Sequence, residues 1–190
     1  MNKRVAVSLG HYPSAPGAVC PSGKYANLTE YTLDAPIVGL IIKELQYRGI
    51  DAFLVPTGHL TTKVNYINSK GFDFAIEMHL NADPDSDSVG TSEARGCETL
   101  YNVGSTKGEQ FAKSIQGKLI SGLPLTNRGV KPRSDLAFLR DTSCPAVIVE
   151  PAFIDDVGAD GTSELNTIME NHVLLASLIA EAIHIVFNTI

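Results

Sequence analysis

The sequence contains no tryptophan, only three cysteines and no long apolar run. Cys20, Cys97 and Cys144 are far apart and none belongs to a Cys-x-x-Cys pair, so they indicate neither a disulfide framework nor a cysteine-bound zinc knuckle. No apolar stretch approaches the roughly 18 residues needed to span a bilayer, and the apolar residues 5–9 are too few for a signal peptide. We therefore expect reduced thiols, no membrane insertion, and synthesis in the cytoplasm without a signal peptide.

Clusters of positive charge are also missing. The chain has 15 Lys and Arg against 21 Asp and Glu, a formal charge of -6, and its longest basic run is the pair Lys3-Arg4. Nucleic acid is therefore excluded as a partner, because phosphate binding needs clustered Lys and Arg. A chain of 190 residues with 44% hydrophobic content predicts one domain over residues 1–190, and we expect it to be a monomer.

Short apolar runs alternate along the chain with segments of helical periodicity. This alternation predicts an α/β fold, a single domain with a mixed, mostly parallel β-sheet flanked by helices on both faces. The sheet is expected to be mixed because the connection between residues 139 and 146 is too short for a crossover helix. The predicted strands are 4–9, 52–55, 72–79, 98–101, 136–139 and 146–149, and the predicted helices are 33–45, 61–69, 106–119 and 163–187.

The start of the first helix has two interpretations. Either the helix begins near Pro36 with Asp34 as its cap, or it begins near Thr29 and Glu30 and is distorted where Pro36 lacks an amide hydrogen.

Three groups with metal-binding chemistry stand at the boundaries of these elements. His11 follows the first strand, Glu30 stands near the start of the first helix, and His79 ends the apolar run 72–79. Two imidazoles and one carboxylate can hold a catalytic zinc while a fourth position stays open for water. The spacing alone is weak evidence, because the chain has no His-Glu-x-x-His motif.

A second apolar strand ends in a carboxylate at Glu150, which predicts a general base and acid at the same edge of the sheet. Cys144 suggests a thiol nucleophile instead, but buried thiols are usually inert and no helix N-terminus follows to lower its pKa.

Several motifs in order resemble the zinc-dependent N-acetylmuramoyl-L-alanine amidases of the amidase 3 family, over nearly the whole chain. These are LGH at 9–11, GA at 17–18, Glu30, EMHLNA at 77–82, NRGVK at 127–131, LRDT at 139–142 and PAVIVEPAFI at 145–154. The resemblance implies that His11, Glu30 and His79 bind Zn²⁺ and that Glu150 is the catalytic glutamate.

The chain departs from the family pattern at three places. The family usually has an acid shortly before Gly-His and glycines just after it, where this chain has Ser8-Leu9 and Tyr12-Pro13-Ser14. In place of the frequent Thr-Arg it has Thr57-Gly58-His59, which makes His59 the rival metal ligand. Arg140 has two open roles: it stabilises charge or orients Glu150 in catalysis, or it binds carbonyls of the neighbouring loop.

The resemblance implies hydrolysis of the amide bond between N-acetylmuramic acid and the L-alanine of the stem peptide in peptidoglycan. Two alternatives remain open: a zinc amidohydrolase that acts on soluble muropeptide fragments, and a non-catalytic peptidoglycan-binding module. Because no signal peptide is seen, we expect a protein that reaches the bacterial cell wall as a phage endolysin does, through membrane lesions. A housekeeping amidase whose signal has been removed is the alternative.

Overall fold

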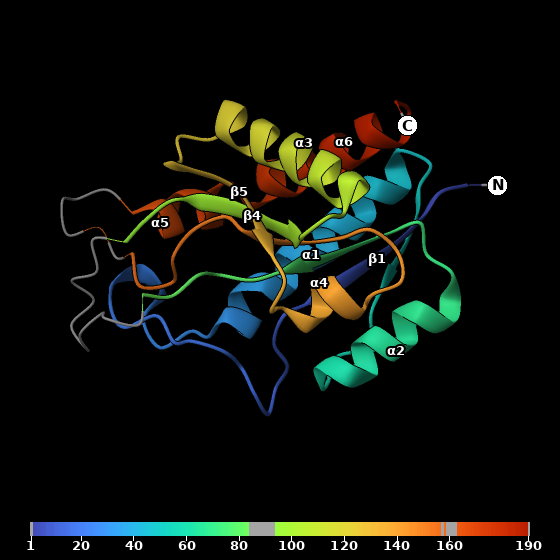
Figure 1. Cartoon of the computed structure of the whole chain (residues 1–190). Coiled ribbons are helices and arrows are strands. Elements are labelled where there is room, and N and C mark those ends of the chain that lie inside the picture. The colour runs from blue at the N-terminus through green and yellow to red at the C-terminus, as the bar shows by residue number, and fades with distance from the viewer. Residues whose placement is uncertain (1, 84–93, 157, 159–162, 190) are drawn as a thin grey trace.

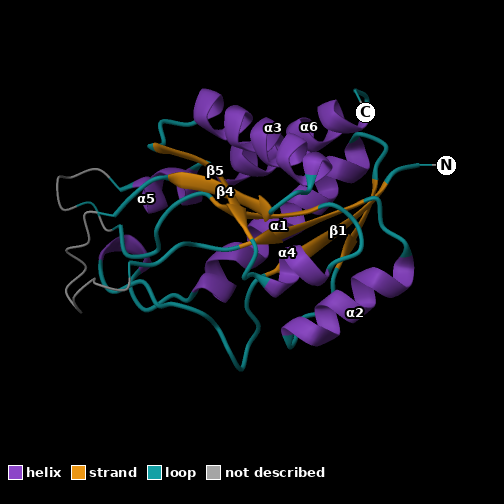
Figure 2. Ribbon diagram, viewed as in Figure 1, coloured by secondary structure: helices purple, strands orange, loops and turns teal. Residues whose placement is uncertain are grey.

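The computed structural model describes residues 2–83, 94–156, 158 and 163–189, and it shows a six-stranded sheet with helices on both faces (Figures 1 and 2). The predicted fold class is confirmed. The strand order is β2-β1-β3-β6-β4-β5. The strands are β1 (Arg4–Leu9), β2 (Asp51–Leu54), β3 (Phe74–Met78), β4 (Cys97–Asn102), β5 (Asn127–Arg133) and β6 (Ala146–Glu150). The helices are α1 (Glu30–Tyr47), α2 (Leu60–Lys70), α3 (Thr106–Gly122), α4 (Ala137–Asp141), α5 (Glu164–Glu170) and α6 (His172–Phe187), with a 3₁₀ turn η1 (Gly23–Tyr25).

The sheet is mixed because β4 runs antiparallel to β6, whereas every other neighbouring pair is parallel. The reason given from the sequence was wrong. Residues 137–139 belong to α4 and form no strand, since Phe138 and Leu139 pack under the sheet as one buried helical turn. The strand β5 was missed because it contains Pro132 and four polar residues, a composition that an edge strand tolerates.

Alternating side chains divide the core into two layers. Val5, Val7 and Ile76 face the layer that contains α1, α3 and α6, whereas Ala6 and Ala75 face the layer that contains α2 and α4. Figure 2 shows the same arrangement, with α3 and α6 on one side of the strands and α2 and α4 on the other. Both faces of the central strands are therefore buried, which leaves the carboxyl ends of these strands as the place for polar groups.

The structure decides between the two interpretations of the first helix. α1 begins at Glu30, and Thr29 caps it by accepting a hydrogen bond from the Thr32 amide at 3.3 Å. Pro36 lies inside the helix. The helix start therefore presents Glu30 at its first position.

The single C-terminal helix predicted over 163–187 is wrong. The chain breaks at Asn171, whose backbone leaves the helical region, and α5 and α6 meet at 82°. In the described part of the chain no helix alone has the length and apolar character to cross a membrane, and the bent pair α5–α6 meets that test only when its two helices are taken together.

Candidate metal centre

The three predicted ligands come from the ends of neighbouring elements. His11 lies two residues beyond β1, His79 follows β3 directly, and Glu30 opens α1. β1 and β3 are adjacent and parallel, so both histidines lie at the same edge of the sheet. Gly10 permits this approach, because a Cβ atom there would lie 2.1 Å from Cε1 of His79.

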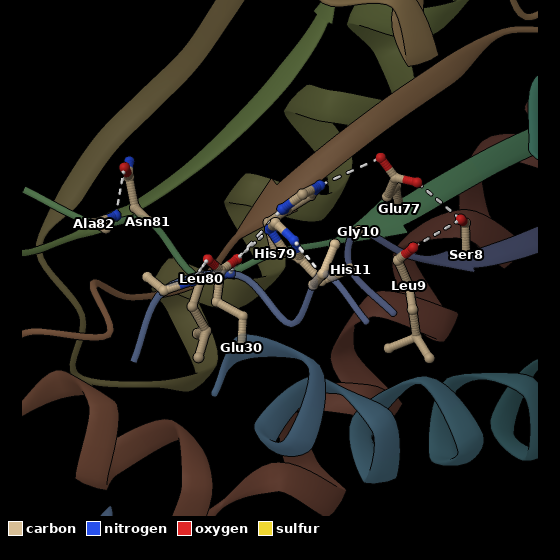
Figure 3. Close-up of polar contacts among 12 residues, drawn as sticks. Ser8, Leu9, Gly10, His11, Glu30, Glu77, His79, Leu80, Asn81 and Ala82 are labelled. Atoms are coloured by element: carbon tan, nitrogen blue, oxygen red, sulfur yellow. Dashed lines mark hydrogen bonds and ion pairs between the residues drawn. The ribbon is translucent and has the colours of Figure 1, made fainter. Parts of the chain in front are cut away.

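The structure brings these three side chains together (Figure 3). Their ligand atoms all lie within 4.8 Å of one another. Oε2 of Glu30 is 3.3 Å from Nε2 of His11 and 3.4 Å from Nδ1 of His79. The two imidazole rings meet edge to face, with centroids 5.1 Å apart. The cluster could hold a metal ion.

The other nitrogen of each imidazole is held by an acceptor. Nδ1 of His11 lies 3.2 Å from the carbonyl oxygen of Ala15, and Nε2 of His79 lies 3.3 Å from Oε1 of Glu77. In the neutral form that binds a metal, these acceptors favour the tautomers in which Nε2 of His11 and Nδ1 of His79 carry the lone pairs. This donor set fits a mononuclear zinc site with an open position.

The backbone also positions Glu30. Its Oε1 accepts a hydrogen bond from the Ala18 amide at 2.8 Å, and its Oε2 accepts one from the Leu80 amide at 3.3 Å. The Ala18 amide reaches the carboxylate because the preceding residue, Gly17, turns with φ +81° and has no Cβ to strike it.

Electrostatic coupling within the cluster is strong. Burial by itself raises the pKa of Glu30, but hydrogen bonds from His11 and His79 outweigh burial and lower this pKa to about 2. Burial lowers the pKa of His79, yet the carboxylates of Glu30 and Glu77 outweigh that effect and raise it to about 10. The pocket therefore stabilises positive charge at the position where a cation would bind.

Glu150 ends β6, the strand next to β3, and the amide of His79 donates to the carbonyl of Val149 at 3.1 Å. Burial raises the pKa of Glu150 to about 7; the nearby His79 lowers this pKa and the carboxylates of Glu98 and Glu30 raise it. A carboxyl group with this pKa can both accept and donate a proton near neutral pH.

The remaining candidates lie outside the cluster. Arg140, half exposed on α4, donates to Asp141 at 2.7 and 2.9 Å and not to Glu150, so its contacts support no catalytic role. Nδ1 of His59 lies 3.2 Å from the Tyr12 hydroxyl, and His59 is not among the grouped ligands. Burial raises the pKa of Cys144 to about 11, which opposes a thiolate nucleophile.

The sequence analysis missed the buried polar residues behind the histidines. Glu77 was a visible signal, since it is a carboxylate within the apolar run 72–79. Ser8 and Glu77 are register partners on β1 and β3, and the Ser8 hydroxyl donates to Glu77 at 2.8 Å. Asp34 was considered only as a helix cap, yet it is fully buried and burial raises its pKa to about 8.

An α/β domain that holds two imidazoles and a carboxylate at the carboxyl edge of parallel strands has a site that could hold a metal ion. Comparison with known proteins specifies the family. Residues 5–184 match the model of amidase 3, N-acetylmuramoyl-L-alanine amidase, and the chain belongs to this family. The resemblance seen in the sequence is confirmed.

Two curated relatives are similar in sequence, and solved structures are similar in fold. An uncharacterised protein of Clostridium perfringens is 32% identical over 95% of this chain and 51% of its own length. The sporulation-specific N-acetylmuramoyl-L-alanine amidase of Bacillus subtilis is 26% identical over 81% of this chain and 57% of its own. The chain spans about half the length of these relatives. A crystal structure of an N-acetylmuramoyl-L-alanine amidase from Clostridium difficile 630 has the same fold, with a TM-score of 0.79, 22% identity and coverage of 99% of this chain and 96% of its own.

Proposed function

We propose that the protein is a zinc-dependent peptidoglycan hydrolase that cleaves the amide bond between the lactyl group of N-acetylmuramic acid and the L-alanine of the stem peptide. The observation that carries this proposal is the convergence of His11, Glu30 and His79 within 4.8 Å. Membership in the amidase family supports the choice of bond. Peptidoglycan is the proposed partner and the bacterial cell wall the proposed place of action.

Zinc is the proposed ion because of the donor set. Two neutral imidazoles and one carboxylate are a frequent ligand set of catalytic zinc, whereas calcium and magnesium prefer sites built of oxygen. His11, Glu30 and His79 would hold the ion, with the Ala15 carbonyl and the Glu77 carboxylate fixing the two rings. When bound, zinc supplies Lewis acidity, which polarises a carbonyl and lowers the pKa of water toward about 7.

Glu150 is the proposed general base and acid. With a pKa near 7 it accepts a proton from the attacking water and then gives that proton to the nitrogen of L-alanine as the amide bond breaks. Glu98, on the facing strand, is unsuited to this task, because Arg128 and Lys131 each donate to its Oε2 at 2.6 Å. The role of Arg140 as a stabiliser of negative charge stays a prediction, and its contacts with Asp141 do not support it.

Room for a substrate lies beside the cluster. A cavity of about 290 Å³ is lined by His79 and Glu77 together with Tyr12, His59 and Phe138. The aromatic wall of this cavity suits the apolar part of a substrate, and His79 is the member of the cluster that lines it. His59 is therefore proposed as a substrate contact.

The test is the mass spectrometry of soluble products after the zinc-loaded protein is incubated with purified peptidoglycan, beside a sample treated with a chelator. Stem peptides with a free L-alanine amine, released only with metal, are expected. If intact sacculi release nothing while soluble muropeptides are cleaved, the protein processes fragments. If neither substrate is cleaved by protein that binds zinc, the non-catalytic binding module is the correct interpretation.

A further inference from the structure

Lys63 is a buried cation next to the metal cluster, and it lines the cavity described above together with Glu77. It extends from the first turn of α2 and is only 2% exposed. Its Nζ donates to the carbonyl oxygens of Leu9 and Gly10 at 2.9 and 3.0 Å and to Oε2 of Glu77 at 2.5 Å. These three bonds use every hydrogen of the ammonium group. One side chain thus joins the end of β1, which leads into His11, to the end of β3, which leads into His79.

Glu77 uses both of its oxygens. Oε2 accepts from Lys63. It also accepts from the Ser8 hydroxyl at 2.8 Å, and Oε1 lies 3.3 Å from Nε2 of His79 (Figure 3). An ionised carboxylate only accepts hydrogen bonds, so when a metal displaces one proton from the ring, Nε2 of His79 keeps its proton and Nδ1 gains a free lone pair. Nδ1 is the nitrogen that faces Glu30.

We propose that Lys63 and Glu77 are positioning residues for the metal centre: Glu77 fixes the tautomer and orientation of His79, and Lys63 holds Glu77 and the backbone before His11. This inference rests on the proposed function, because it requires that the cluster bind Zn²⁺. A buried ion pair is seldom more stabilising than apolar side chains of the same volume. Because the Lys63–Glu77 ion pair contacts His79 and the backbone before His11, its main role is in the metal site and not in the stability of the fold.

The carboxylate of Glu77 cannot be replaced by an amide. Glutamine offers one acceptor oxygen, which can face either His79 or the pair of donors from Lys63 and Ser8, but not both. The Glu77→Gln variant is therefore expected to bind Zn²⁺ about 10- to 100-fold more weakly than the wild type, the usual loss when a partner of a ligand histidine is removed. Competition with a chelator of known zinc affinity measures this change.

A double variant separates positioning from stability. Lys63→Met with Glu77→Leu removes both charges together, which a buried site tolerates, and leaves Nε2 of His79 without its acceptor. Because the carbonyls of Leu9 and Gly10 lose their donor as well, we expect its zinc-free form to unfold no lower than the Gln116→Met control below, while its affinity for Zn²⁺ falls by the same 10- to 100-fold. The loss of zinc affinity in the double variant would then not be explained by a loss of stability.

Gln116→Met is the matched control. Gln116 is 4% exposed, against 3% for Glu77, and hydrogen bonds to Cys97, Thr99 and Asn127 on the far strands β4 and β5. This variant is expected to lower the unfolding temperature while its zinc affinity stays within twofold of the wild type.

Nitrogen NMR of the zinc-loaded wild type is expected to show His79 protonated at Nε2, and this signal should shift or exchange rapidly in Glu77→Gln.

The outcomes distinguish the two proposals. If the wild type does not bind Zn²⁺, the proposed function and this inference both fail. If the wild type binds Zn²⁺ and both Glu77 variants bind it equally well, with His79 still protonated at Nε2, only the positioning role is refuted. A loss of affinity in Gln116→Met as large as in Glu77→Gln would also refute it, because the effect would then reflect general destabilisation.

Discussion

Replacing Glu150 by glutamine removes the proposed proton acceptor and keeps the size of the side chain. General acid–base catalysis contributes about 10² to 10⁴ in rate, so kcat should fall by that factor, which corresponds to roughly 3 to 5 kcal/mol of activation free energy. Zinc affinity should stay near the wild-type value, because Glu150 is not among the three grouped ligands. The assay is the release of L-alanine amines from peptidoglycan, with zinc content measured on the same samples.

The pH dependence of kcat/KM tests the role of Glu150 independently. Burial raises the pKa of Glu150 from 4.5 to about 7, and a bound cation lowers it again, so the acid limb of kcat/KM should have its midpoint between these two values. Below the midpoint the base is protonated and the rate falls about tenfold per pH unit. The residual activity of Glu150→Gln should lack this limb.

Glu98→Gln is the control for Glu150→Gln, since Glu98 is the register partner of Glu150 but its carboxylate is engaged by Arg128 and Lys131. Its activity should fall by less than tenfold. If Glu150→Gln retains activity within tenfold of the wild type, or if Glu98→Gln loses as much, Glu150 is not the general base.

Three further predictions concern the cluster and its surroundings. Because the pKa of His79 is raised to about 10 without metal, zinc binding at pH 7 should release about one proton, seen by titration calorimetry in two buffers of different ionisation enthalpy; equal heats in both would contradict this. Burial raises the pKa of Asp34 from 3.8 to about 8, so the folded state retains a proton that the unfolded chain loses. The zinc-free protein should therefore lose up to about 1.4 kcal/mol of stability per unit as the pH rises between these values, and Asp34→Asn should lack this slope in urea denaturation; parallel curves would refute it. Gly10→Ala places a Cβ atom 2.1 Å from the ring of His79 and should weaken zinc binding at least tenfold by chelator competition, whereas Gly39→Ala, with open space around it in α1, should leave zinc affinity unchanged and add about 0.5 to 1 kcal/mol of stability.

The sequence by itself determined the fold class and the candidate ligands. The run 72–79 predicted a buried strand ending at His79, because an apolar run bounded by glycine and polar residues has few other conformations in a globular domain. Glu30 was predicted as a ligand near the start of the first helix, although the sequence left that start open between Thr29 and Pro36. Such patterns involve residues that are near one another in the sequence, so they can be predicted without the tertiary structure.

Only the tertiary structure decided the contacts between distant segments. β5 forms because β4 offers it a partner, although its own residues are polar and include Pro132. Arg140 is adjacent in sequence to Asp141, and that ion pair takes its guanidinium away from Glu150. Lys63 and Glu77 are 14 residues apart and meet only because α2 packs on the face of the sheet that carries Ala6 and Ala75. Burial and long-range pairing depend on the folded chain as a whole, so the local pattern of residues cannot specify them.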